Sequence, residues 1–315
     1  MKKKPIAKIG IAIRTLTAGI FAINKFIEHT SIKKRLLCRN EKNYYNWKLG
    51  RICYTIHGSG SPVLLIHDSI PCCSTHEWDA IIDNLSKNHT VYCMDLLGCG
   101  CSDRPKITYT NYLYVQLIND FIKNIIKEKT DIVTSGLSGI HALMACKNDD
   151  SQIGKLIMIN PEDLAVLAKT PTWKTKILKA FIEIPVFGTC IYNIVAAKGN
   201  LELLFTERYL YNPFHLDYSV LDYYYETAHL ANGNGKYLYS SLKGNFLYMN
   251  IAGALKTIKT PIYILEGEGE SHSKEIVELY KVLNPRIHCE FLSKNKHIPH
   301  IESPDTISKL LHKIL

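Results

Sequence analysis

The segment from Asp131 to Ala145 constrains the fold of this chain more than any other. Ile132 and Val133 are typical of a short buried strand, the small residues after them allow a tight turn, and an apolar helix is predicted to follow. A strand, a tight turn and a helix in this order lift one side chain off the end of a sheet strand, where it can attack a substrate. In the register that sterics favour, that position falls on Gly136, which has no side chain.

Two registers fit this turn, and they disagree about the attacking residue. One seats Gly136 at the turn and places Ser138 and Gly139 as the small residues that must follow it. The other seats Ser138, which offers a hydroxyl, but it puts Ile140 and His141 where the crossing of strand and helix needs small residues. Sterics favour the first register and chemistry favours the second. Ser138 is equally suited to capping the helix, so its role stays open.

The positive charge of the chain is concentrated at one end. The formal net charge is +9, and residues 1–39 contain ten lysines and arginines against one acid, Glu28. The rest of the chain has 28 basic and 28 acidic residues. A protein whose folded body binds nucleic acid would carry basic stripes on that body, so no nucleic-acid partner is expected. A basic terminal segment suits an anionic membrane surface instead.

The same basic segment has apolar residues spaced by threes and fours, which form one stripe on a helix. They are Ile6, Ile9, Ile13, Leu16, Ile20, Ile23 and Ile27. The uncharged run from Thr15 to Asn24 is only about half of the roughly 20 residues that span a bilayer. Three interpretations stay open: an interfacial helix on a membrane, a helix packed on the body, and a secretory signal without a clear cleavage site.

The ten cysteines show no framework spacing, and buried reduced thiols in a cytoplasmic protein are expected. Neither Cys72-Cys73 nor Cys99 and Cys101 has the Cys-x-x-Cys spacing of a zinc site. The chain also lacks a Gly-x-Gly-x-x-Gly motif, a phosphate-binding loop and a His-Glu-x-x-His motif. We therefore expect no metal and no cofactor.

Short apolar runs alternate with helical patterns before and after a long segment in which the pattern changes. This alternation predicts an α/β fold with a doubly wound, mostly parallel sheet. Between Glu162 and about Thr260, amphipathic helices dominate. The predicted organisation is a basic segment over residues 1–39, a sheet-containing core over 40–160 and 261–315, and a helical insertion over 161–260.

Four sequence pieces together resemble the α/β-hydrolase superfamily. They are the strand Pro62–His67, the Asp-x-x-Gly-x-Gly-x-Ser stretch within Val91–Pro105, the turn around Gly136, and His297–Pro304 with a proline-initiated helix after it. The resemblance covers roughly residues 47–315. It implies a helical cap over an active site and the chain order nucleophile, acid, histidine.

The resemblance implies a histidine and an acid at particular positions. His297 occupies the position of the catalytic histidine, while His300 is expected to be structural. Glu270 follows the predicted strand at Ile262–Leu265 and is the preferred acid. Glu162 or Asp163, beside Pro161, is the alternative.

The nucleophile and the oxyanion donors depart from the family pattern. The catalytic assignment is Ser138 with Glu270 and His297, and Ser135 is a more distant candidate. The backbone N–H groups of Ser69 and Gly139 are the expected oxyanion donors. The sequence has Asp68 where the family has glycine, and an inward-pointing Asp68 carboxylate would repel an oxyanion.

Three functional hypotheses follow. The first is a serine hydrolase that acts on a small hydrophobic ester or related acyl compound. The second is a catalytically silent relative that binds a small apolar ligand or a partner protein, because Gly136 lacks a side chain. The third is chemistry without an acyl-enzyme, with His297 as base for a water or a substrate proton.

Overall fold

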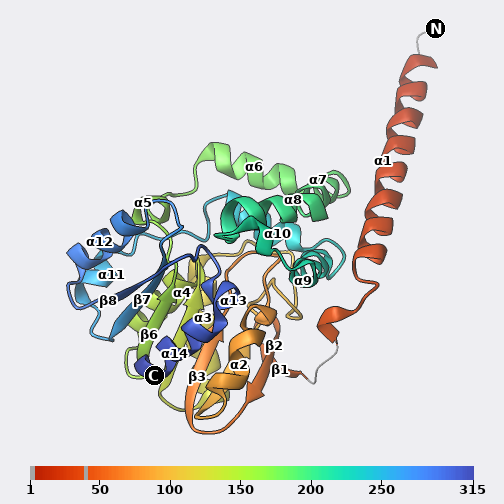
Figure 1. Ribbon diagram of the computed structural model, residues 1–315. Coiled ribbons are helices and arrows are strands. Elements are labelled where there is room, and N and C mark those ends of the chain that lie inside the picture. Colours follow the sequence, from red (N-terminus) through yellow and green to blue (C-terminus); the bar gives the residue numbers. More distant parts are fainter. Residues whose placement is uncertain (1–3, 39–41) are drawn as a thin grey trace.

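A computed structural model describes residues 4–38 and 42–315 (Figure 1). Its described residues form one eight-stranded sheet in the order β1-β2-β4-β3-β5-β6-β7-β8. The first two strands pair antiparallel with their neighbours, and all the others pair parallel. The strands are β1 (Asn43–Trp47), β2 (Gly50–His57), β3 (Ser61–Ile66), β4 (His89–Met94), β5 (Thr130–Ser135), β6 (Ile153–Ile159), β7 (Ile262–Gly267) and β8 (His288–Leu292). The predicted doubly wound, mostly parallel α/β sheet is confirmed.

Helices cover both faces of the sheet, as the continuous apolar strands require. Alternate residues of β3 show this: Leu64 and Ile66 belong to the cluster that includes helices α3 and α4, whereas Val63 and Leu65 pack with α2 and α14. The helices of the core are η1 (Leu36–Cys38), η2 (Thr75–Trp78), α2 (Asp79–Leu85), α3 (Asn111–Phe121), η3 (Ile122–Ile126), α4 (Ser138–Asn148), α12 (Ser273–Leu283), α13 (Pro299–Glu302) and α14 (Pro304–Ile314).

A run of helices separates β6 from β7, and most of them lie beyond one end of the sheet strands (Figure 1). These helices are α5 (Leu164–Leu167), α6 (Trp173–Glu183), α7 (Phe187–Val195), α8 (Lys198–Leu204), η4 (Phe205–Tyr209), η5 (Pro213–His215), α9 (Tyr218–His229), α10 (Gly235–Lys243) and α11 (Ala252–Thr257). Their inner side chains and the ends of β3, β5, β6 and β7 enclose a common cavity.

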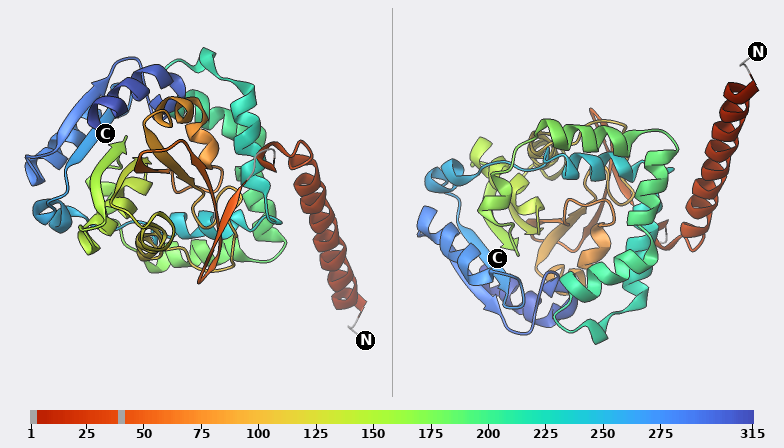
Figure 2. Two further views of the ribbon diagram at one scale, coloured as in Figure 1. Left: turned by 90° about the horizontal axis from the view of Figure 1, so that it is seen from below. Right: turned by 90° about the horizontal axis from the view of Figure 1, so that it is seen from above.

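Helix α1 (Lys4–Ser31) stands away from the body in all three views (Figures 1 and 2). Only its C-terminal part is docked: Asn24 Nδ2 donates to the Val186 carbonyl at 2.9 Å, and Ser31 Oγ donates to the Tyr225 hydroxyl at 2.9 Å. The stretch Gly10–Ser31 is long and apolar enough to cross a membrane, a test that signal sequences and core helices of soluble proteins also pass. The uncharged run from Thr15 to Asn24 alone therefore understates its apolar length.

Candidate active site

Gly136 lies at the turn between β5 and α4, with a φ of +56° that favours glycine. Its N–H donates to the Ile159 carbonyl at 3.0 Å, which ties the turn to β6. A Cβ atom added to Gly136 would lie 2.6 Å from the carboxyl carbon of Asp68 and 2.8 Å from both of its oxygens. The chain therefore follows the register that seats Gly136, and Asp68 fills the space in front of it.

The Asp68 carboxylate is held by two backbone N–H groups. Its Oδ1 accepts a hydrogen bond from Ser69 N at 2.7 Å and another from Leu137 N at 2.9 Å. These groups come from the loop after β3 and from the residue after the turn, which are the positions of oxyanion donors in this architecture. Ser69 was predicted as a donor. The second donor is Leu137 rather than Gly139, because the Gly139 N–H is bonded to the Gly136 carbonyl at 3.2 Å.

His67 fixes the backbone of Asp68. Leu96 N donates to His67 Nε2 at 3.0 Å, so the ring carries its proton on Nδ1 and donates it to the Asp68 carbonyl at 2.7 Å. His67 is fully buried and lies outside the cavity lining, which agrees with a structural role. This neutral imidazole joins the end of β3 to the loop after β4 and so determines where the Asp68 carboxylate lies.

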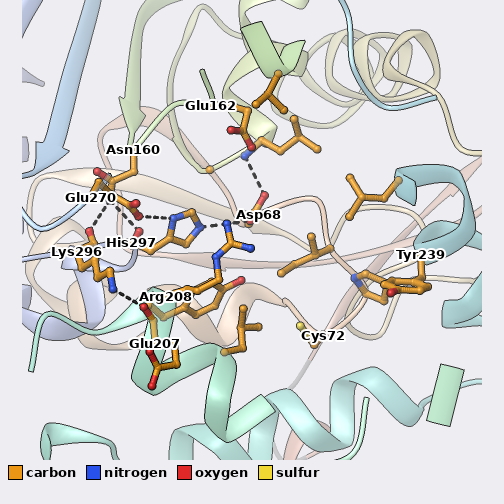
Figure 3. A pocket seen from close by; sticks show the side chains of 18 of the residues that line it. Asp68, Cys72, Asn160, Glu162, Glu207, Arg208, Tyr239, Glu270, Lys296 and His297 are labelled. Carbon is orange, nitrogen blue, oxygen red and sulfur yellow. Dashed lines mark hydrogen bonds and ion pairs between the residues drawn. The ribbon is translucent and has the colours of Figure 1, made fainter. Parts of the chain in front are cut away.

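His297 lies between two carboxylates (Figure 3). Its Nδ1 is 2.8 Å from Glu270 Oε1, and its Nε2 is 3.6 Å from Asp68 Oδ2. The ring of Tyr209 stacks on the imidazole with centroids 4.7 Å apart. Burial disfavours the charged imidazole, but Asp68 and Glu270 outweigh burial and raise the pKa of His297 to about 10. At neutral pH the imidazole is therefore protonated.

Asn160 connects the two loops that carry the acid and the histidine. Its Oδ1 accepts from Gly267 N at 2.7 Å, at the end of β7. Its Nδ2 donates to the carbonyls of Lys296 and His297 at 2.7 and 2.9 Å. Asn160 was not among the predicted site residues. Its signal was its position before Pro161 at the end of a central strand, where parallel strands gather functional side chains.

The Ser138 hydroxyl is not bonded to His297, Glu270 or Asp68. Its side chain is fully buried, and Oγ lies 2.8 Å from the Ser135 carbonyl and 3.2 Å from the Ile66 carbonyl. Since Gly136 takes the turn, Ser138 falls in the first turn of α4 and faces the sheet. Ser135 is also fully buried within β5. The structure thus places neither serine where His297 could activate it.

Neither alternative acid accepts the hydrogen bond of the His297 ring. Glu162 and Asp163 line the same cavity, but Asp163 caps α5 by accepting from Ala165 N at 2.8 Å. The His297 ring is bonded to Glu270, the preferred acid. His300 is fully buried against Trp78, with ring centroids 4.5 Å apart, as expected of a structural residue.

The cavity beside these groups has a volume of about 780 Å³. Asp68, Gly136, Glu270 and His297 line one wall, and the helical insertion supplies most of the other. The insertion's lining is mainly apolar and aromatic, with Val166, Leu201, Leu204, Tyr239, Leu242 and Tyr248. The insertion also contributes charged side chains to the lining, including Glu162, Arg208 and Lys243. A cavity of this size is typical of sites for small molecules.

The family model described as the alpha/beta hydrolase fold matches residues 62–304 of this sequence. The chain belongs to the α/β-hydrolase family. The matched segment begins in β3 and ends at the start of α14, so it contains Asp68, Gly136, Glu270 and His297. The predicted membership is confirmed.

Known proteins resemble this chain to different extents. The 2-hydroxy-6-oxo-6-(2'-aminophenyl)hexa-2,4-dienoic acid hydrolase of Metapseudomonas resinovorans is 30% identical over 36% of this chain and 40% of its own length. The Cif epoxide hydrolase of Acinetobacter nosocomialis has a TM-score of 0.73 at 16% identity, covering 94% of this chain and 96% of that one. A membrane phospholipase A, a bacterial virulence factor, has a TM-score of 0.69 at 17% identity and covers 99% and 97%. The two structural likenesses show the fold alone.

Within residues 4–38 and 42–315, no group of three or more His, Cys, Asp and Glu residues is placed to hold a metal ion. The cysteines that the structure describes are free thiols, and Cys72 is the one that lines the cavity. Asp68, Glu270 and His297 are titratable side chains of the cavity wall beside Gly136.

Proposed function

We propose that this protein is a hydrolase that acts on a small, mainly apolar substrate in the cavity under the helical insertion. One observation carries the proposal: the Glu270–His297 pair, at 2.8 Å, lines the same cavity as Asp68, whose Oδ1 accepts the N–H groups of Ser69 and Leu137. A histidine oriented by a carboxylate can transfer protons, and a neighbouring pair of backbone N–H groups can stabilise negative charge.

The proposed chemistry does not use Ser138. A serine-based mechanism needs a hydroxyl within hydrogen-bond reach of the imidazole, and the Ser138 hydroxyl is bonded instead to carbonyls of Ser135 and Ile66. This position of the Ser138 hydroxyl favours the hypothesis that no acyl-enzyme forms on a serine and that His297 transfers the protons. Since His297 is protonated at neutral pH, it acts first as an acid and becomes a base only after losing that proton.

The catalytically silent relative is the second candidate function. It is favoured by the Asp68 carboxylate, which already occupies both backbone donors and would repel a substrate oxyanion. The cavity of about 780 Å³ would then hold an apolar ligand without converting it. The two candidates share a binding cavity and differ only in turnover.

Turnover by the full-length protein decides between them. We would measure hydrolysis of a panel of small aryl and alkyl esters, lactones and epoxides by wild type, His297→Ala and the exposed-histidine control His312→Ala. The hydrolase proposal expects turnover of at least one substrate, retained in His312→Ala and reduced about 10²-fold or more in His297→Ala. Folded wild type that binds but converts no substrate would establish the silent relative.

Fluorophosphonate labelling adds a direct test of the serine hypothesis. These probes modify activated serines, and we expect no adduct on Ser138 because its hydroxyl is bonded to the Ser135 and Ile66 carbonyls. An adduct on Ser138 that disappears in His297→Ala would instead restore the Ser-His-acid mechanism with Glu270. In that case the turn must rearrange, because Ser138 Oγ is fully buried.

We further propose that α1 attaches the protein to an anionic membrane surface. The free part of the helix exposes apolar side chains such as Ile13, Leu16 and Phe21, each more than half exposed. The exposed apolar side chains Trp173, Ile177, Phe181 and Ile194 lie on α6 and α7. Helix α7 contacts α1, because Asn193 Nδ2 donates to Asn24 Oδ1 at 3.1 Å. Val195, at the end of α7, lines the cavity, so a membrane on this side would lie next to the substrate.

A further inference from the structure

We propose that Asp68 is the nucleophile of this hydrolase and that its substrate is an epoxide. The proposal rests on the hydrolase function above and specifies its mechanism and substrate class. It also explains why the turn holds Gly136: the attacking group has moved from the turn to the neighbouring loop after β3.

The position of the carboxylate is the first argument. A side chain on Gly136 would begin 2.6 Å from Asp68 Cγ, so the carboxylate occupies the volume that an attacking side chain at the turn would fill. Asp68 also lines the cavity, and its side chain is 10% exposed. A nucleophile needs this combination of a fixed position and an opening toward the substrate.

The two carboxylate oxygens have different surroundings, which is the second argument. Oδ1 accepts both backbone N–H groups, from Ser69 and Leu137. Oδ2 has neither donor and lies 3.6 Å from His297 Nε2. Oδ2 is therefore the oxygen free to attack, and Oδ1 is already seated where the carbonyl oxygen of an ester on Asp68 would be polarised.

The occupied donors also select the substrate. Attack on an acyl carbon would create an oxyanion on the substrate, and the Ser69 and Leu137 donors are bound to Asp68. Attack on a saturated carbon creates no oxyanion at that carbon, but it expels a leaving group. An epoxide oxygen leaves as an alkoxide and needs one proton, which the His297 imidazolium can supply.

The first step balances with the groups present. Oδ2 of the Asp68 carboxylate forms a C–O bond to one epoxide carbon while the C–O bond from that carbon to the ring oxygen breaks. The alkoxide takes the proton from His297 Nε2. The products are a hydroxyalkyl ester on Asp68 and a neutral imidazole, whose Nδ1 remains bonded to Glu270.

The second step hydrolyses this ester. The neutral His297 imidazole removes a proton from water, and the hydroxide attacks Cγ of Asp68. The charge develops on Oδ1, where Ser69 N and Leu137 N donate to it. The bond from Cγ to the alkyl oxygen breaks, and that alkoxide takes the proton of the new carboxylic acid. A diol leaves, with Asp68 again a carboxylate and His297 again an imidazolium.

Heavy-oxygen water provides the decisive test on wild-type protein. With excess enzyme and styrene oxide as probe, the second step puts solvent oxygen into Asp68 and returns a protein oxygen to the diol. Mass spectrometry should find one heavy oxygen in the peptide that contains Asp68 and none in the peptide that contains Glu270. If the heavy oxygen appears only in the diol, water attacks directly and Asp68 is not the nucleophile.

Substitution at Asp68 gives an independent readout. Asp68→Asn keeps an oxygen for the two N–H groups but removes the nucleophile, so epoxide turnover should fall about 10³-fold or more, in the range seen when covalent catalytic groups are removed. The control Asp83→Asn removes an exposed aspartate of α2 and should retain turnover. Unfolding in urea followed by far-ultraviolet circular dichroism verifies that both variants are folded.

The outcomes separate this inference from the proposed function. Ester turnover that depends on His297, without epoxide turnover or label in Asp68, would overturn the inference and leave the hydrolase function intact. Epoxide turnover retained in Asp68→Asn would overturn it in the same way. Absence of all turnover from folded wild type would overturn both.

Discussion

The carboxyl carbon of Asp68 lies 2.6 Å from the point where a Cβ on Gly136 would be. Real side chains do not approach so closely, so the two positions compete for one space: a side chain at the turn requires the Asp68 carboxylate to leave its two N–H donors or a smaller residue to replace it. The chain has aspartate at position 68 and glycine, which has no side chain, at position 136. This exclusion relates the two departures from the family pattern, which the sequence presents as separate.

The exclusion predicts that a serine hydrolase can be built only by two changes together. Gly136→Ser alone should be unfavourable, because a residue other than glycine at this positive φ costs about 1–3 kcal/mol and its Cβ meets Asp68. Adding Asp68→Gly should open the space and free both backbone donors. Fluorophosphonate should then label the introduced serine in the double variant.

The single variants are the controls for this labelling. Asp68→Gly alone should give no adduct because it has no nucleophile at the turn. The adduct in the double variant should be lost when His297→Ala is added. Equal labelling of Gly136→Ser with and without Asp68→Gly would show that the carboxylate does not compete for this space.

A second prediction concerns stability against pH. The folded-state pKa of His297, about 10, lies above its ordinary value of 6.5. The bound proton therefore stabilises the fold fully below about pH 6.5, and this contribution is lost as pH rises through about 10. The free energy of unfolding should fall over this interval, and less steeply in Asp68→Asn, which removes one of the two carboxylates.

Urea unfolding at several pH values measures this difference, with Asp83→Asn as the matched control. NMR titration of the imidazole protons reports the same pKa directly. A His297 resonance that titrates near 6.5 in wild type would show that the two carboxylates do not hold the proton.

A third prediction concerns Asn160. Asn160→Gly keeps the positive φ of 47° accessible but removes the hydrogen bonds to Gly267, Lys296 and His297. We expect the free energy of unfolding to fall by about 1–3 kcal/mol and kcat to fall by roughly ten-fold or more because His297 moves relative to Asp68. Asn245→Gly, also at a positive φ but outside the cavity lining, should lower stability slightly and leave kcat unchanged.

The arrangement of the sheet could be predicted because its signals are local. Apolar runs such as Val63–Ile66 belong to strands buried on both faces, and the alternation with helices fixes a parallel sheet. His297 and Glu270 could also be placed, since each lies in a loop at a fixed distance from a predictable strand. The structure pairs them at 2.8 Å.

The centre of the site could not be predicted from local signals. The register of the turn depends on the φ of Gly136, and two readings of the same residues satisfied the sequence. The Asp68 carboxylate was considered only as a repulsive group, because its distance from Gly136 depends on two loops far apart in the chain. Leu137 was missed for the same reason, since its N–H becomes a donor only in the register that seats Gly136.

The last prediction concerns α1. Leu16 is 60% exposed and Phe21 is 52% exposed on its free part. Burying such side chains in a membrane contributes about 1.5–3 kcal/mol each, so Leu16→Asp with Phe21→Asp should weaken binding to anionic vesicles by at least about ten-fold. Leu279→Asp with Val282→Asp is the matched control, because it also replaces two exposed apolar side chains, on α12. Flotation with phosphatidylserine-containing vesicles measures the bound fraction.

Equal loss in the two double variants would contradict anchoring by α1, since added negative charge alone would then account for the effect. Loss confined to the α1 variant would place the anchor on the free part of the helix, beyond the docked segment at Asn24–Ser31.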